Sequence, residues 1–108
     1  MSLSTHVLDT VHGRPAGGVP VRLDRYDGDT WRHLAEAETG DDGRLRDLPA
    51  WDAGTYRLRF GTGPYFAGRG VETFFPEVSV IFVITDPGEH HHVPLLLSPF
   101  GYSTYRGS

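Results

Sequence analysis

Short apolar runs, each bounded by glycine, proline or aspartate, recur along the whole chain, and this spacing constrains the fold more than any other feature. Such runs, separated by turn-forming residues, are typical of β-strands. Patterns with the period of a helix are almost absent. The sequence therefore predicts an all-β domain, and seven or eight strands in roughly 100 residues favour a sandwich of two sheets.

The expected strands follow from the alternation of apolar and polar residues. The clearest case is 55–60, where Tyr56, Leu58 and Phe60 alternate with arginines, so that one face can be buried. Residues 64–70 are the one predicted helix, because proline suits the first helical position and glycine the position past the end. The predicted strands cover residues 4–10, 20–26, 30–38, 44–47, 55–60, 78–85, 90–98 and 100–107.

Three local features refine this prediction. The turn-rich segment 12–18 separates the first two strands, and in the second strand Val21 and Leu23 alternate with Arg22 and Asp24. The strand 78–85 is apolar on both faces, so we expect the core to cover one face and another subunit to cover the other. The Asp-Pro-Gly turn at 86–88 predicts that 90–98 returns as a hairpin partner of 78–85.

Composition excludes several classes of protein. A chain of 108 residues is expected to form one domain, residues 1–108. Its net charge of -4 argues against binding nucleic acid or an anionic membrane and favours a small-molecule or protein partner. It has no cysteine, and all ten basic residues are arginine, which excludes disulfides, thiolate catalysis and Schiff-base lysines. With no signal-peptide pattern or long apolar run, we expect a soluble, cytoplasmic protein.

Histidines at 90–92 are the first candidates for chemistry, because imidazoles exchange protons near neutral pH or bind metals. In an extended strand His90 and His92 share one face, whereas His91 joins Val93 on the other. On the first strand His6 shares a face with Leu8 and Thr10. His6 can meet His92 only if the two strands are neighbours or meet across an interface. Further polar candidates are Arg44, Arg46, Tyr105, Arg106 and Ser108.

Each candidate also has a simpler interpretation. His90 and His92 could both reach one zinc ion, with His6 or another residue completing the site. His6 alone is more often a strand histidine with a local hydrogen bond. Arg44 could be a solvated turn residue, and Arg46 is a rival for its role. The tail 102–108 could be a frayed terminus, and the scattered Asp and Glu side chains are expected to serve solvation.

Four segments together resemble the 5-hydroxyisourate hydrolases, the transthyretin-like enzymes of urate breakdown. They are LSTHVLDTVHGRPA, TGDDGR, FFPEVSVIFVI and HHHVPLLLSPFGYSTYRGS, and the closing Tyr-Arg-Gly-Ser is the most specific. The resemblance covers nearly the whole chain. It implies a transthyretin-like β-sandwich of two four-stranded sheets with one short helix, assembled as a homotetramer (a dimer of dimers) with active sites in a channel between dimers.

Position by position, the resemblance implies that His6, Arg44, His92 and Ser108 are catalytic. The same four residues, together with Tyr105 and Arg106, are implied to bind substrate. One departure is His91, which is often aromatic in the family. Because His91 points away from His92 in a strand, we expect a local packing change only.

The implied reaction is hydrolysis of 5-hydroxyisourate to 2-oxo-4-hydroxy-4-carboxy-5-ureidoimidazoline, with no metal and no cofactor. A neutral imidazole of His92 or His6 can deprotonate water, and the Arg44 guanidinium can stabilise a developing oxyanion. No Gly-x-Ser-x-Gly motif is present, which favours direct attack by water. Two alternatives stay open: a non-enzymatic carrier of an aromatic ligand, and a small metal-binding or structural β-domain.

Overall fold

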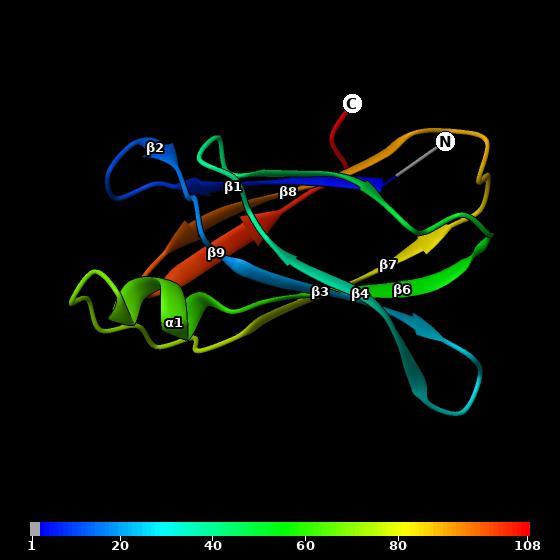
Figure 1. The fold of residues 1–108 in the computed structure, drawn as a ribbon, viewed down its shortest axis with the longest axis horizontal. Helices are drawn as coiled ribbons and strands as arrows, with labels where there is room; N and C mark the ends of the chain where they lie inside the picture. The colour runs from blue at the N-terminus through cyan, green and yellow to red at the C-terminus, as the bar shows by residue number, and fades with distance from the viewer. Residues whose placement is uncertain (1–2) are drawn as a thin grey trace.

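A computed structural model describes residues 3–108 and contains two β-sheets packed face to face (Figure 1). One sheet has the order β2-β1-β8-β9, with β5 also paired to β1, and the other has the order β4-β3-β6-β7. The predicted all-β sandwich is confirmed. The elements are β1 (Leu3–Asp9), β2 (Arg14–Pro15), β3 (Pro20–Tyr26), β4 (Trp31–Glu38), β5 (Arg44–Leu48), β6 (Gly54–Phe60), α1 (Thr62–Ala67), β7 (Val78–Ile84), β8 (His91–Ser98) and β9 (Gly101–Thr104).

The first sheet has one more strand than the four expected. Within the segment 12–18, predicted as a turn, Arg14–Pro15 forms the two-residue strand β2. Both β2 and β5 pair antiparallel with β1, β2 at the end of β1 that contains Asp9 and β5 at the end that contains Leu3. Since β8 pairs along the full length of the opposite edge of β1, the two short strands share the remaining edge.

The predicted hairpin between 78–85 and 90–98 is wrong. β7 pairs with β6 in one sheet, whereas β8 pairs with β1 and β9 in the other. The turn at 86–88 therefore carries the chain from one sheet to the other. Turn chemistry predicts a change of direction, but it does not specify which sheet receives the next strand, and here each strand has an apolar face that contributes to the shared core.

Alternation is clearest in β6 and β7, and each sheet turns an apolar face inward. Leu58 and Phe60 in β6 and Leu95 and Leu97 in β8 are all almost fully buried. Asp24 in β3 departs from the pattern, because the register shifts after Leu23 and its carboxylate is only 2% exposed. Two arginines of β6 donate to it, so this carboxylate is paired inside the protein and does not serve solvation.

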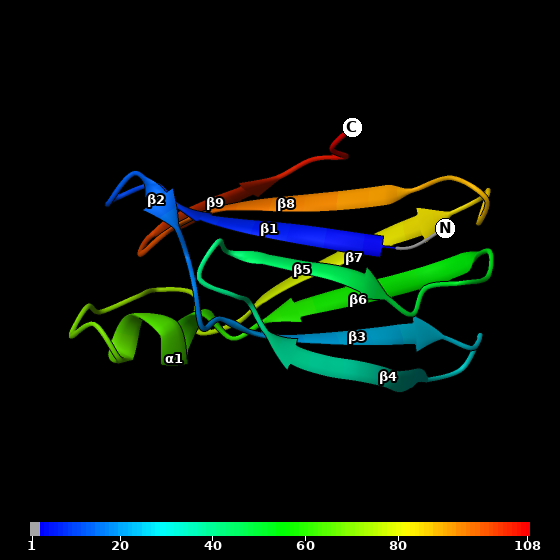
Figure 2. The same cartoon turned by 45° about the horizontal axis from the view of Figure 1, so that its top comes forward.

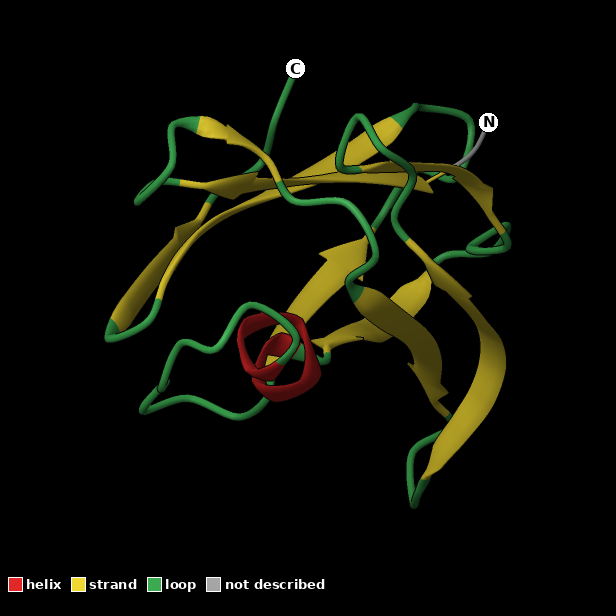
Figure 3. Ribbon diagram, turned by 60° about the vertical axis from the view of Figure 1, so that its left-hand side comes forward, coloured by secondary structure: helices red, strands yellow, loops and turns green. Residues whose placement is uncertain are grey.

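The helix is displaced from its predicted bounds of 64–70. α1 covers Thr62–Ala67 and lies at one end of the sandwich (Figure 3). Pro64 is therefore its third residue, where the missing N–H costs no intrahelical hydrogen bond. Gly70, with φ of 68°, follows beyond the helix. In the described part of the chain no helix is long and apolar enough to cross a membrane.

The outer face of β7 is apolar and uncovered in the single chain. Val78 and Ile84 are buried in the core, whereas Ile81 and Val83 are 60% and 61% exposed. The core thus covers one of the two apolar faces that the sequence indicated. That another subunit covers the outer face of β7 stays a prediction.

Candidate functional site

Parallel pairing of β1 with β8 brings the first strand beside the histidine-rich strand (Figure 2). Ser4 lies opposite His92, and His6 lies opposite Pro94. On the other edge of β1, the pairing with β5 sets Arg44 opposite His6. His6, Arg44 and His92, which are far apart in the sequence, therefore gather on neighbouring strands of one sheet within one chain.

An open pocket of about 310 Å³ lies beside these strands. His6 is not part of its wall; the His6 Nε2 atom is buried and has no hydrogen-bond partner among the described residues. Buried polar atoms without a partner are rare in proteins, so this one needs an explanation. The residues that line the pocket are Ser4, Thr5, Arg44, Arg46, Asp47, His90, His92 and Ser108.

Both candidate histidines are held in the neutral form. Burial lowers the pKa of His92 below its ordinary value of 6.5, and the positive charge of Arg44 lowers it further. The pKa of His6 is lowered by the same two causes in the same order. Burial and a nearby cation both disfavour the imidazolium. At pH 7 the two rings are therefore uncharged, which is the form that can accept a proton from water.

Arg44 and its rival Arg46 both line the pocket. Arg46 donates to the Asp42 carboxylate over 3.0 Å, which offsets part of its charge. The charge of Arg44 lowers the pKa of both histidines, whereas Arg46 contributes only to His6 and after Arg44. Arg44 is therefore the better placed of the two to act electrostatically at the histidines.

The last residues fold back over His92 and are not frayed. The Gly107 N–H donates to the His92 carbonyl over 2.8 Å, which makes a β-bridge between the two residues. A Cβ at position 107 would lie 2.5 Å from His92 Cδ2 and 3.2 Å from Pro94 Cγ. Only glycine allows the tail to approach the imidazole this closely, and the approach brings Ser108 to the pocket.

Tyr105 and Arg106 lie elsewhere in the single chain. They line a second hollow of about 210 Å³ with Val80 and Phe82 of β7, and His92 lines this hollow as well as the first pocket. Arg106 is exposed and donates to the Glu89 carboxylate over 3.0 Å. The structure thus brings Arg44, His92 and Ser108 to one pocket with His6 beside it, and directs Tyr105 and Arg106 to a second hollow that shares only His92 with the first.

Sequence reasoning missed three residues of the pocket wall, Ser4, Thr5 and Asp47. Ser4 Oγ lies 2.8 Å from His92 Nδ1 and 3.0 Å from His90 Nε2. The two-residue spacing of Ser4 and His6 was a usable signal, since it sets both on one strand face. No sequence signal indicated Asp47, which has a positive φ of 58°. Among residues 3–108, no three His, Asp or Glu side chains are placed to hold a metal ion.

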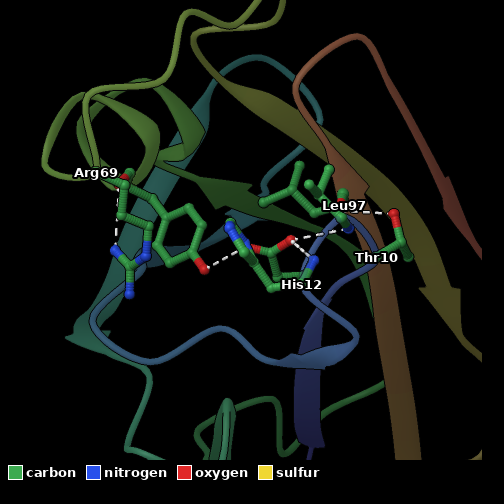
Figure 4. Close-up of polar contacts among 7 residues, drawn as sticks. Thr10, His12, Arg69 and Leu97 are labelled. Atoms are coloured by element: carbon green, nitrogen blue, oxygen red, sulfur yellow. Dashed lines mark hydrogen bonds and ion pairs between the residues drawn. The ribbon is translucent and has the colours of Figure 1, made fainter.

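A second polar cluster surrounds Asp9, with His12 and Arg69 at its margins (Figure 4). The Asp9 carboxylate is buried and accepts hydrogen bonds from the Tyr65 hydroxyl over 2.8 Å and from the backbone N–H of Val11 over 3.0 Å. His12 Nδ1 lies 2.9 Å from the same carboxylate. These contacts tie β1 to α1, so the expectation that acidic residues serve only solvation is wrong for Asp9.

Residues 3–107 match the model of the HIUase/Transthyretin family. The 5-hydroxyisourate hydrolase of Salmonella dublin is 49% identical over 109 residues, which cover 98% of this chain and 80% of that protein. The solved structure of Klebsiella pneumoniae 5-hydroxyisourate hydrolase has 44% identity and a TM-score of 0.88 over the whole of both chains. Sea bream transthyretin, solved in complex with thyroxine, has 32% identity and a TM-score of 0.92, over 99% of this chain and 95% of that one.

The transthyretin-like fold predicted from the resemblance is confirmed by these neighbours. The sequence match is as extensive as the structural one. The chain belongs to the HIUase/Transthyretin family.

Proposed function

We propose that this protein hydrolyses 5-hydroxyisourate to 2-oxo-4-hydroxy-4-carboxy-5-ureidoimidazoline in urate degradation. The observation that carries the proposal is the pair of neutral histidines beside the Arg44 guanidinium at a polar pocket. Relatives that are 5-hydroxyisourate hydrolases by name, and that match nearly the whole chain, support the same activity. Fold alone would not separate this activity from others on the same sandwich.

In the proposed reaction His92 removes a proton from a water molecule as that water attacks the cyclic acyl carbon, and the His92 imidazolium returns the proton to the ring nitrogen as the acyl C–N bond breaks. His92 suits this role because it lines the pocket and its lowered pKa keeps it unprotonated. The His6 Nε2 atom beside it is buried and has no partner among the described residues, and we propose that it binds a polar group of the substrate or the water once substrate binding uncovers it.

Arg44 supplies the fixed positive charge. The guanidinium at the pocket wall first binds the carbonyl-rich ring of the substrate. As the acyl carbon becomes tetrahedral, its oxygen gains negative charge, and the same guanidinium stabilises that charge. Ser108 lines the same pocket and offers its hydroxyl to orient the water. Tyr105 and Arg106 are proposed to contact substrate through assembly, because in one chain they line a different hollow.

The assembly we propose is a homotetramer built as a dimer of dimers, located in the cytoplasm. Support comes from the apolar outer face of β7, where Ile81 and Val83 stay exposed, and from the apolar hollow between β7 and the tail. Apolar surface of this kind is costly to leave in water and is typical of interfaces. A small organic substrate is the only further partner proposed.

The alternative, a carrier of an aromatic ligand, finds support in sea bream transthyretin, which was solved with thyroxine. A carrier needs an apolar surface around its ligand. The pocket found here is lined instead by hydroxyl, carboxylate, guanidinium and imidazole groups, which an aromatic ligand would desolvate without compensation. The hydrolase is therefore the better supported function.

The test generates 5-hydroxyisourate from urate in situ with urate oxidase and follows its ultraviolet decay. The protein should accelerate the decay, and His92→Ala should lower the rate by about 10² to 10⁴, the usual contribution of a positioned base. His33→Ala is the matched control, because His33 lies on β4 and outside the pocket. No acceleration, or equal rates for the His92 and His33 variants, would refute the proposal, and saturable thyroxine binding in its place would favour the carrier.

A further inference from the structure

Ser4 and His90 contact His92 but have no role in the reaction described above. Ser4 is 8% exposed, whereas His90 is exposed immediately before β8, and both line the pocket with His92. Ser4 Oγ lies 2.8 Å from His92 Nδ1 and 3.0 Å from His90 Nε2. The two rings are stacked, with centroids 6.5 Å apart and planes inclined by 18°. One buried hydroxyl therefore bridges two imidazoles.

This bridge restricts where the imidazole protons can lie. A serine hydroxyl has one proton to donate, and a neutral imidazole has one N–H and one acceptor nitrogen. If Ser4 donates to His90 Nε2, then His92 must donate to Ser4 from Nδ1, which leaves His92 Nε2 unprotonated. If Ser4 donates to His92 Nδ1, the His92 proton is on Nε2 and that nitrogen cannot act as a base.

The surrounding charge distinguishes the two arrangements. Arg44 lines the same pocket as His92, and its charge acts on the His92 ring strongly enough to disfavour the imidazolium. The same positive charge favours a lone pair over an N–H on the part of the ring that faces the pocket. Since Nδ1 faces Ser4, the nitrogen left for the pocket is Nε2.

We propose that Ser4, backed by His90, is a positioning residue that holds His92 in the tautomer with its proton on Nδ1, so that Nε2 is the base. The bridge fixes the plane of the ring as well as its proton, because Nδ1 is tied to β1 while Gly107 packs on the Cδ2 edge. His90 matters as the acceptor that keeps the Ser4 proton directed away from His92. The kinetic part of this inference rests on the proposed hydrolase function.

The direct test is the ¹⁵N spectrum of the histidine rings at neutral pH, in the full-length protein, with His92 assigned by comparison with His92→Gln. In the wild type, His92 Nδ1 should have the shift of a protonated nitrogen and Nε2 that of an unprotonated one. In Ser4→Ala the two shifts should move toward each other or exchange, and Ser4→Thr, which keeps the hydroxyl, should retain the wild-type values. A wild-type proton on Nε2, or unchanged shifts in Ser4→Ala, would overturn the inference.

The kinetic test separates positioning from binding. Ser4→Ala should lower kcat about three- to tenfold, as expected for one neutral hydrogen bond, while KM stays within about twofold because no proposed substrate contact is lost. Ser4→Thr should restore kcat, and Thr30→Ala, which removes an exposed hydroxyl in the β3–β4 turn, should leave kcat unchanged. An equal loss in Ser4→Ala and Ser4→Thr, or a change in KM alone, would contradict a tautomer role.

His90→Ala gives an independent measurement that leaves the interior unchanged, because His90 is exposed. It should shift the His92 tautomer in the same direction as Ser4→Ala, and the two substitutions combined should cost less than the sum of their effects. Full additivity would mean that Ser4 and His90 act separately and would overturn the bridge. If the wild type fails to hydrolyse 5-hydroxyisourate, the proposed function fails, and the ¹⁵N shifts still decide the tautomer.

Discussion

Gly107→Ala is the substitution that most directly tests how the tail completes the pocket. A methyl group at this position would lie 2.5 Å from His92 Cδ2 and 3.2 Å from both His92 Cγ and Pro94 Cγ. Two carbon atoms in contact need about 3.5 Å, so the tail must retreat by roughly 1 Å or the imidazole must rotate. A displacement of about 1 Å at reacting groups can cost roughly 100-fold in rate, and Ser108 and His92 would both be displaced.

The assay is kcat/KM for 5-hydroxyisourate together with thermal unfolding. Activity should fall about 10- to 100-fold, whereas the melting temperature should change little, because residues 102–106 next to this position are exposed. Gly101→Ala is the matched control, since its Cβ would meet only Ser98 Oγ at 3.7 Å, an ordinary contact. Activity of Gly107→Ala within about twofold of the Gly101 variant would refute the role assigned to the tail.

Three further predictions concern pH, stability and assembly. Burial and the charge of Arg44 lower the pKa of His6 and His92, so the hydrolysis rate should rise with pH through an inflection below 6.5. The residual rate of Arg44→Ala should have its inflection at higher pH, because the cation is gone. An unmoved inflection would contradict the assignment of a histidine next to Arg44 as the base. Asp9→Asn should destabilise the fold by about 2 kcal/mol at pH 7, measured by denaturant unfolding, because a buried carboxylate loses charge-assisted hydrogen bonds, whereas Asp27→Asn in an exposed turn should have a much smaller effect. Burial alone would raise the pKa of Asp9, but hydrogen bonds from His12 and Tyr65 hold that pKa below 3.8. The stabilisation by the Asp9 carboxylate is therefore complete above pH 3.8. The difference in unfolding free energy between wild type and Asp9→Asn should shrink as the pH falls through the pKa of Asp9 in the folded protein. Ile81→Glu should reduce the assembly measured by sedimentation, and Thr30→Glu, in the exposed β3–β4 turn, should not.

The strands could be predicted because burial of one face imposes a period of two, as in β6 and β8. The pairing of those strands could not be predicted from the same pattern. Periodicity records which side chains are buried, and β7 and β8 bury theirs from opposite sheets whether or not a short turn joins them. The two-residue strand β2 was missed for a related reason, since two exposed residues, Arg14 and Pro15, have no alternation to detect.

Within the site, the catalytic and substrate-binding candidates were predicted from the family resemblance. Strand alternation predicted that His90 and His92 share one face, and the contacts of both rings with Ser4 confirm it. Alternation cannot supply contacts across strands. The parallel pairing of β1 with β8 is what sets Ser4 opposite His92, and only coordinates reveal that register. The position of Tyr105 and Arg106 away from the pocket could not be predicted from alternation either, because β9 and its regular strand pairing end at Thr104.

The pocket and His6 beside it concentrate unfavourable features that the rest of the described sandwich avoids. His6 Nε2 is buried without a partner among the described residues, Asp47 adopts a positive φ, and Arg44 lies near two imidazoles whose cations it disfavours. Elsewhere buried charge is compensated, as at Asp9 and Asp24. A carrier would gain nothing from these costs, since it needs only complementary apolar surface. A hydrolase does gain, because a neutral base can deprotonate water and a nearby cation can stabilise the developing oxyanion. The location of the strain is therefore an argument for catalysis that is independent of any similarity to known proteins.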